Sequence, residues 1–297
     1  MGSTVGRNVN ELLGVDADAR LLIVNCDDLG MYRAVNRGII EAVTSGVATT
    51  CSLMTPCPGA AHAIKLLRQH PHIPFGIHLT VVCDLPGHRW GPLVSKEKVP
   101  SLLDGDGELF GVRRLDELMA QARLDELELE FRAQIETALT AKFAPTHLDW
   151  HCFRDGGRDD VFELGVALAR EYGLALRASD RDTQQRLRTH GLPATDHPLL
   201  DSFSLEIDGK PARYAQLLRT LPPGLSQWAV HPALADDEAK ALDPDGWRVR
   251  HSDCEFLLSR QAHEIIAREN IQLLDYVRLQ QAWQANRGAL TSQRTQT

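Results

Sequence analysis

Acidic, histidine and arginine side chains recur where short apolar runs of this sequence end. They are Asp27, Asp28, His78, His147, Asp149, His151, Arg177 and His231. In folds built from parallel strands and helices, the active site lies beyond the carboxyl ends of the strands. If the apolar runs are such strands, these side chains converge on one rim, where carboxylates and imidazoles can bind a divalent metal ion.

Asp27 and Asp28 are adjacent carboxylates that follow the apolar run Leu21–Cys26. Two such charges repel each other in a site that excludes water, and a divalent cation relieves the repulsion by binding one of them. The other carboxylate is then available as a base. The alternative interpretation is structural, with the pair capping and charging the first turn of a helix near Arg33.

His78 lies in a predicted strand, Ile73–Val81. A single histidine in such a strand is typically a core residue, but the polar residues at neighbouring strand ends favour a metal ligand here. One carboxylate and two imidazoles leave coordination positions open for water and substrate, as a catalytic metal site requires.

His147, Asp149 and His151 share one face of another predicted strand. Along an extended strand, His147 and His151 would lie about 13 Å apart, too far for one ion to bind both. Either the chain turns after His147 or only one of the two is a ligand. We favour His147 as the ligand, with Asp149 orienting a neighbouring imidazole and His151 facing the substrate. The alternative is a polar layer inside a barrel, without chemistry.

His231 precedes Pro232, which fixes the exit of the chain from a predicted strand. A histidine held at the rim can act as a general acid that protonates a leaving amine. The alternative is a capping or packing histidine. Stacking and hydrogen bonding could hold a substrate through Trp90, Trp150 and Arg177.

Apolar runs with the length of strands alternate with amphipathic stretches along the chain. The predicted strands are Leu21–Cys26, Val47–Met54, Ile73–Val81, His147–His151, Leu174–Arg177, Ser226–His231 and Ile271–Leu274. The predicted helices are Arg33–Ser45, Ala60–Gln69, Leu115–Lys142, Val161–Tyr172, Tyr214–Leu221, His251–Arg268 and Tyr276–Gln284. This alternation predicts an α/β fold whose parallel sheet closes, or nearly closes, into a barrel. The long segment Cys83–Val112 has no periodicity, which is typical of a functional loop.

We expect a flexible N-terminal arm over residues 1–19, a single domain over 20–284 and a flexible tail over 285–297. The net charge of -8 and the absence of a basic run argue against nucleic acid as the main partner. No apolar run approaches the roughly 18 residues of a membrane span, and the N-terminus does not resemble a signal peptide. Six cysteines without a CxxC pair indicate reduced thiols. A cytoplasmic protein is therefore expected, and a homodimer is compatible with the sequence.

At these motifs the chain resembles the YdjC-like family of carbohydrate deacetylases, some of which act on chitooligosaccharides. The matching segments are Asn25–Gly30, Val35-Asn36, Gly38-Ile39, Cys51–Met54, Gly76–Thr80, Pro145–His151, Arg177, Val230–Pro232 and Glu255–Leu258. The resemblance covers residues from about Arg20 to Tyr276 and keeps these segments in the family's order. The sequence departs from the family pattern at Cys152 and Ala233, where the family often has His and Gly.

The resemblance implies a distorted TIM-like (β/α) barrel and removal of an acetyl group from an N-acetylated sugar or oligosaccharide. It implies one divalent ion, Mg²⁺ or Zn²⁺, held by Asp28, His78 and His147. It also implies Asp27 as the base and His231 as the acid. Two rival interpretations are another metal hydrolase on the same barrel, acting on a phosphoester or cyclic amide, and a sugar-binding protein without catalysis.

Overall fold

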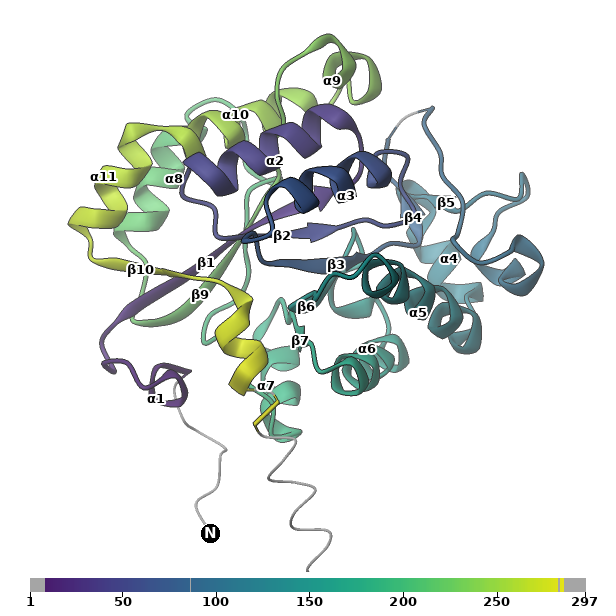
Figure 1. The fold of residues 1–297 in the computed structure, drawn as a ribbon, viewed down its shortest axis with the longest axis horizontal. Coiled ribbons are helices and arrows are strands. Elements are labelled where there is room, and N and C mark those ends of the chain that lie inside the picture. Colours follow the sequence, from purple (N-terminus) through teal and green to yellow (C-terminus); the bar gives the residue numbers. More distant parts are fainter. Residues whose placement is uncertain (1–8, 86, 283, 286–297) are drawn as a thin grey trace, which may run out of the picture.

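The computed structural model describes residues 9–85, 87–282, 284 and 285, and its centre is one curled parallel sheet (Figure 1). The strands are β1 (Arg20–Leu29), β2 (Thr50–Leu53), β3 (Phe75–Leu79), β6 (His147–Trp150), β7 (Ala175–Leu176), β8 (Leu200–Asp201), β9 (Gly224–Val230) and β10 (Ile271–Leu274). They pair in the order β7-β6-β3-β2-β1-β9-β8, and β10 pairs with the first half of β1. Among the described residues β7 and β8 are not paired with each other, so the distorted TIM-like barrel is incompletely closed.

The helices surround this sheet (Figure 1). They are α1 (Val9–Leu13), α2 (Arg33–Ser45), α3 (Ala60–Gln69), α4 (Leu115–Gln121), α5 (Leu124–Thr140), α6 (Asp159–Tyr172), α7 (Arg181–Thr189), α8 (Lys210–Arg219), α9 (Asp237–Leu242), α10 (Trp247–Leu258) and α11 (Arg260–Arg268). Their apolar faces cover the sheet, and nine of the ten residues of β1 are buried because neighbouring strands and helices enclose it. The predicted α/β barrel in a single domain is confirmed.

Two predicted helices are each two helices in the structure. The predicted helix Leu115–Lys142 breaks after α4, because Arg123 adopts an extended conformation and its backbone N–H donates to Ser101 Oγ at 2.9 Å. The predicted helix His251–Arg268 breaks at Ser259, whose side chain accepts from Ala262 N and caps α11. In both cases a polar side chain replaces the helical partner of a backbone N–H, a choice that periodicity alone does not reveal.

The N-terminal arm predicted over residues 1–19 is only partly described. Residues 1–8 lie outside the described residues, as do 286–297 of the predicted tail. From Val9 onward the chain forms α1, and Val9 is buried. The Asn10 side chain donates to the carbonyl oxygens of Asp16, Ala17 and Ala19 at 2.8–3.1 Å. This part of the predicted arm is therefore tied to the start of β1.

The segment Cys83–Val112 forms its own small structure at the carboxyl end of the barrel. It is closed by a parallel pair of short strands, β4 (Val82–Cys83) and β5 (Phe110–Gly111). Three short 3-10 turns lie within or after it, at Lys96–Lys98, Pro100–Leu102 and Val112–Arg114. In the described part of the chain no helix is both long and apolar enough to cross a lipid bilayer. All six cysteines are free.

The backbone after β9 is held tightly against α2. A Cβ atom added to Gly38 would lie 2.7 Å from the Cα of Ala233, so only glycine fits at this crossing. Leu234 N also donates to Ala34 O at 3.2 Å, and Ala233 N donates to Arg250 O at 3.2 Å. These contacts fix the segment that follows His231 and thereby hold this histidine at the rim.

Candidate active site

A cavity of about 980 Å³ opens at the carboxyl ends of the strands. Seven residues that the sequence singled out line it, namely Asp27, Asp28, His78, Trp150, His151, Arg177 and His231. They come from the ends of β1, β3, β6, β7 and β9, and the long segment after β4 contributes one wall. The strand-end rule therefore located this cavity correctly.

A bulge in β1 directs both of its carboxylates into the cavity. Successive residues of a regular strand point to opposite faces, so Asp27 and Asp28 would normally diverge. The pairing between β1 and β2 is irregular between Cys26 and Leu29, and Asp28 has a left-handed backbone with φ of 72°. A bulge re-aims side chains in this way, and non-glycine residues in the left-handed region store strain that is typical of functional sites.

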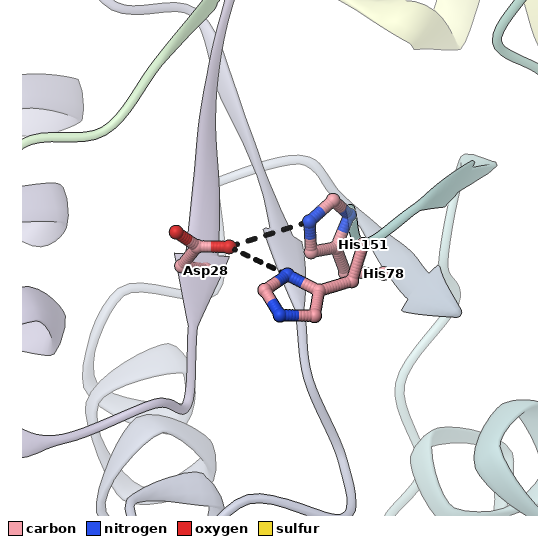
Figure 2. A group of neighbouring side chains, drawn as sticks. All are labelled: Asp28, His78 and His151. Carbon is pink, nitrogen blue, oxygen red and sulfur yellow. Dashed lines mark hydrogen bonds and ion pairs between the residues drawn. The ribbon is translucent and has the colours of Figure 1, made fainter. Parts of the chain in front are cut away.

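Asp28, His78 and His151 form a compact group that could hold a metal ion (Figure 2). Asp28 Oδ1 lies 3.3 Å from His78 Nε2 and 3.2 Å from His151 Nδ1. The three donor atoms lie within 4.8 Å of one another, and all three residues are buried. Asp84 and Cys152 form a second possible group, which shares His151.

Asp149 holds His78 from behind. Its Oδ1 lies 2.7 Å from His78 Nδ1, which leaves His78 Nε2 directed at Asp28. Its Oδ2 accepts from Ser52 Oγ at 2.5 Å and lies 2.7 Å from Arg177 Nη2. Burial opposes a charge on His78, but the attraction and hydrogen bonds of Asp149 and Asp28 prevail and raise its pKa to about 9. The surroundings of His78 therefore favour positive charge at this point.

Arg250, which the sequence analysis did not identify, pairs with Asp28 from the outside. This fully buried guanidinium on α10 donates from Nη1 to Asp28 Oδ2 at 2.8 Å. Burial acts against ionisation of Asp28, yet Arg250 and the two imidazoles outweigh it and hold the pKa of Asp28 well below its usual range. Asp28 thus offers Oδ1 to the imidazoles while Oδ2 remains bound to Arg250.

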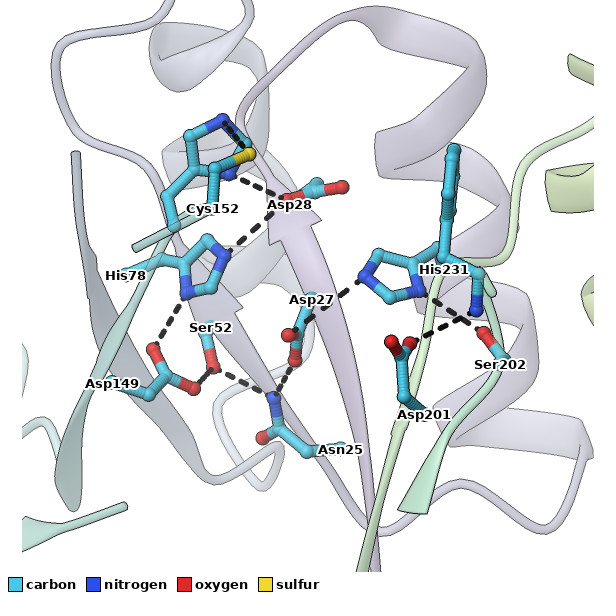
Figure 3. Close-up of polar contacts among 12 residues, drawn as sticks. Asn25, Asp27, Asp28, Ser52, His78, Asp149, Cys152, Asp201, Ser202 and His231 are labelled. Carbon is cyan, nitrogen blue, oxygen red and sulfur yellow. Dashed lines mark hydrogen bonds and ion pairs between the residues drawn. The ribbon is translucent and has the colours of Figure 1, made fainter. Parts of the chain in front are cut away.

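Asp27 is held as an ionised carboxylate by Arg177. The guanidinium donates from Nη1 to Asp27 Oδ2 and from Nη2 to Asp27 Oδ1, both at 2.7 Å. Asn25 Nδ2 donates to Oδ1 at 2.6 Å. Burial would raise the pKa of Asp27, but the charge and hydrogen bonds of Arg177 lower it below its ordinary value. Figure 3 shows Asp27 between the group around His78 and the ring of His231.

His231 is oriented by a chain of hydrogen bonds that ends at a buried carboxylate. One carboxylate oxygen of Asp253 lies 2.8 Å from Lys210 Nζ and accepts a hydrogen bond from Tyr214 OH at 2.5 Å. The other oxygen accepts from Ser202 Oγ at 2.5 Å. The hydrogen of Ser202 is thereby used, so Ser202 Oγ accepts from His231 Nδ1 at 3.0 Å. The other nitrogen, Nε2, then faces the cavity, 3.9 Å from Asp27 Oδ2.

Comparison with known proteins identifies a family that spans most of the chain. The YdjC-like protein family matches residues 21–268. The chain belongs to this YdjC-like family.

Several relatives carry names that describe deacetylation. A carbohydrate deacetylase of Geobacillus stearothermophilus is 33% identical over 73% of this chain and 81% of its own length. One from Brevibacillus brevis is 30% identical over 87% of this chain and 99% of its own. A chitooligosaccharide deacetylase of Serratia marcescens is 30% identical over 73% and 83%.

A solved structure from Enterococcus faecalis V583 is similar in fold as well as in sequence. This protein, provisionally described as a cellobiose-phosphate cleavage protein, superposes with a TM-score of 0.74 at 27% identity. The match covers 87% of the present YdjC-like chain and 98% of the other.

His147 lies away from the group formed by Asp28, His78 and His151, in contrast to the predicted ligand set. It is fully buried, with Nε2 3.2 Å from Ser52 Oγ and Nδ1 2.9 Å from Thr146 Oγ1. Its ring stacks on Tyr276 with centroids 3.7 Å apart, and it fills space that a Cβ on Gly76 would occupy. These contacts engage both ring nitrogens of His147 and fit a packing residue of the barrel interior.

Depth along β6 explains the difference. His147, Asp149 and His151 do share one face, as predicted, but they occupy successive levels from the interior to the rim. His78 pairs in register with Asp149, so a residue one pleat further, His151, reaches the level of Asp28. His151 is thus the histidine of β6 that lies at the carboxyl end of the strand, where active-site residues of parallel α/β folds gather.

Trp150 is among the residues that line the cavity, but most of its ring packs on the other face of β6, so its role in holding substrate stays a prediction. It alternates with Asp149 and His151 and therefore points to the opposite face of β6. A Cβ on Gly165 of α6 would lie 2.5 Å from its indole, and the ring packs edge-on against Phe153 with centroids 5.6 Å apart. Trp90 is also buried. Both indoles are largely buried, and Arg177 lines the cavity with its guanidinium bound to Asp27.

We expect His147→Ala to lower the free energy of unfolding by about 2–4 kcal/mol, because it empties a packed site and removes the stacked partner of Tyr276. Urea unfolding followed by circular dichroism measures this effect. The exposed histidine of the matched variant His72→Ala should change stability by less than about 0.5 kcal/mol. A His147→Ala protein as stable as the unmodified chain would contradict the packing role.

Proposed function

We propose that this chain is a metal-dependent deacetylase that hydrolyses the acetamide of an N-acetylated sugar or oligosaccharide. The observation that carries the proposal is the placement of an ionised carboxylate, Asp27, between a three-donor group and a rim histidine, His231. The names of the bacterial relatives support the substrate class. Amide hydrolysis needs an activated water, a base and an acid for the leaving amine, and the three parts of the site correspond to these needs.

The metal ligands we propose are Asp28, His78 and His151. One carboxylate oxygen and two imidazole nitrogens match a catalytic site, because three protein ligands leave room for water and substrate. The surroundings already favour positive charge at these atoms, since the pKa of His78 is raised to about 9. Two imidazoles suit Zn²⁺ better than Mg²⁺, which prefers oxygen ligands. A bound divalent ion would polarise the acetyl carbonyl and lower the pKa of a water.

Asp27 is the base in this proposal. Arg177 keeps it ionised and fixes both of its oxygens in place, so it is ready to accept a proton from water at neutral pH. Its neighbour Asp28 is occupied by Arg250 and the imidazoles, which leaves the two adjacent carboxylates with different roles. Asp149 orients His78 and does not reach the substrate.

His231 is the acid that protonates the departing amine. Because Ser202 accepts from Nδ1, the proton that is exchanged sits on Nε2, the nitrogen that faces the cavity. Asp253, which pairs with Lys210, fixes the hydrogen of Ser202 and so keeps the imidazole of His231 turned with Nε2 toward the cavity. Ser202 and Asp253 are therefore positioning residues that act through His231.

The ligand set is tested by metal analysis of purified variants. We expect His151→Ala and His78→Ala to lose one equivalent of bound Zn²⁺ per chain, because each removes one of three donors. The matched variant His147→Gln should retain it, since His147 binds Ser52 and Thr146 instead. Loss of zinc in His147→Gln together with full retention in His151→Ala would restore His147 as the ligand.

Acetate release from a panel of N-acetylated sugars tests the reaction itself. We expect Asp27→Asn to reduce the turnover number by at least about 10²–10⁴-fold, because an amide cannot accept the proton of water. Its metal content should equal that of the unmodified protein. Near-normal turnover would remove Asp27 from the mechanism. If no sugar releases acetate but phosphoesters or cyclic amides are hydrolysed, the protein is another metal hydrolase. If sugars bind and nothing is hydrolysed, it is a sugar-binding protein.

A comparison of two leaving groups tests His231 and its orientation. His231→Ala should lower kcat for acetamide hydrolysis strongly and lower it much less for an activated acetyl ester, whose leaving group needs no proton. Ser202→Ala should lower kcat for the amide about tenfold, with KM and metal content unchanged. Nitrogen NMR of His231 should show its proton on Nδ1 in the neutral form, and lose this preference in Ser202→Ala. Equal losses for amide and ester would contradict the acid role.

A further inference from the structure

An exposed aromatic ring at the cavity wall has no part in the mechanism described above. Phe203 lies two residues after the end of β8, and its side chain is 41% exposed. Of the large exposed apolar side chains in the described part of the chain, it alone lines the cavity. Its ring meets the ring of His231 edge-on, with centroids 5.1 Å apart at 77°. An apolar ring that stays in contact with water beside a reactive histidine indicates a surface for a ligand.

The position of Phe203 is fixed by its neighbours. Its backbone N–H donates to Asp201 Oδ1 at 2.9 Å, which sets the turn at the end of β8. The guanidinium carbon of the buried Arg250 lies 5.3 Å from the ring centroid. Its contacts with His231 and Arg250 therefore hold the ring in place while leaving part of it open, as a stacking surface requires.

Charged groups that can bind hydroxyls lie next to this ring. Asp201 Oδ2 accepts from Arg154 Nη2 at 2.5 Å, and both residues line the cavity. Figure 3 shows Asp201 with Ser202 and His231 on one side of Asp27, opposite His78 and Asp149. A pyranose ring presents an apolar face of C–H groups and a rim of hydroxyls. The combination of an aromatic face with a carboxylate and a guanidinium at its edge complements both features.

The reaction geometry places a sugar ring at this point. If His231 Nε2 protonates the leaving amine, the carbon that carries the nitrogen must lie within a few ångströms of His231. The acetyl group then points toward Asp28 and His78, and the sugar ring extends to the side where Phe203 lies.

We propose that Phe203, with Asp201 and Arg154, forms the subsite for the pyranose ring that bears the acetamide. This inference rests on the proposed function, because His231 is what orients the ring toward Phe203. The two large indoles that the sequence suggested for stacking are buried, so Phe203 supplies the aromatic surface that they do not. Phe203 is thus a binding residue that acts on the sugar ring rather than on the acetamide.

Binding to an inactive protein tests the subsite without relying on turnover. The dimer of N-acetylglucosamine is titrated calorimetrically into metal-loaded Asp27→Asn protein, alone and combined with Phe203→Ala, Phe203→Tyr or Ile207→Ala. We expect Phe203→Ala to raise Kd about tenfold, because the stacking surface is lost. Phe203→Tyr keeps the ring and should stay within about twofold. Ile207→Ala is the matched control, because Ile207 is similarly exposed after β8 but does not line the cavity.

In the chain with Asp27 intact, Phe203→Ala should raise KM by a similar factor and leave kcat within about threefold, because the contact is the same in substrate and transition state. The subsite would be overturned by any of three results. These are an unchanged Kd in Phe203→Ala, an equal rise of Kd in Ile207→Ala, and no binding of the sugar by the protein with Phe203 intact. Acetate release separates the two proposals. If Phe203→Ala raises Kd as expected but no sugar releases acetate, the subsite is supported and deacetylation is rejected. If acetate is released but Kd is unchanged in Phe203→Ala, deacetylation is supported and the subsite is rejected.

Discussion

Buried negative charge at the carboxyl ends of the strands is the constraint on which the rest of the site depends. Asp27, Asp28 and Asp149 are all buried within one small region. Isolated carboxylates in such a place would become protonated, because burial penalises the charged form. Two buried guanidiniums, Arg177 and Arg250, pair with them and keep them ionised. Asp243, which is also buried, shares Arg250 through its Nε at 2.8 Å. The carboxylates therefore outnumber the two guanidiniums, and protonated imidazoles or a bound cation offset the excess negative charge.

The two guanidiniums enter from opposite sides and so separate the functions of the carboxylates. Arg177 follows β7 and bridges Asp27 and Asp149. Arg250 reaches in from α10, donates to the outer oxygen of Asp28 and also donates to Asp243. Asp28 therefore presents its inner oxygen to two imidazoles, whereas both oxygens of Asp27 lie against Arg177. Adjacent residues of one strand acquire different chemistry because the bulge in β1 and these partners give each its own surroundings.

Depth within the barrel determines which polar residues can take part in chemistry. His147, Asp149 and His151 lie on one face of β6, yet the first stacks on Tyr276 in the interior, the second orients His78, and the third reaches Asp28. On the β9 side, His231 lies at the rim and depends on Ser202 and Asp253 beneath it. The polar residues that line the cavity are thus held in position by hydrogen bonds from polar residues deeper in the barrel.

Local patterns in the chain were enough to predict the alternation of strands and helices, the α/β barrel and the residues that gather at its rim, because periodicity and strand ends are local properties. Asp27, Asp28, His78, Arg177 and His231 were found in this way, and all of them line the cavity. Which of His147 and His151 reaches the level of Asp28 depends on the register between β3 and β6, and two separate segments of the chain set that register. Arg250, Ser202, Asp253 and Phe203 carried no local signal, since their neighbours in the site lie mostly far away in the sequence. Only the folded structure brings such residues within bonding distance, because side-chain distances across a barrel are set by its curl and packing rather than by spacing along the chain.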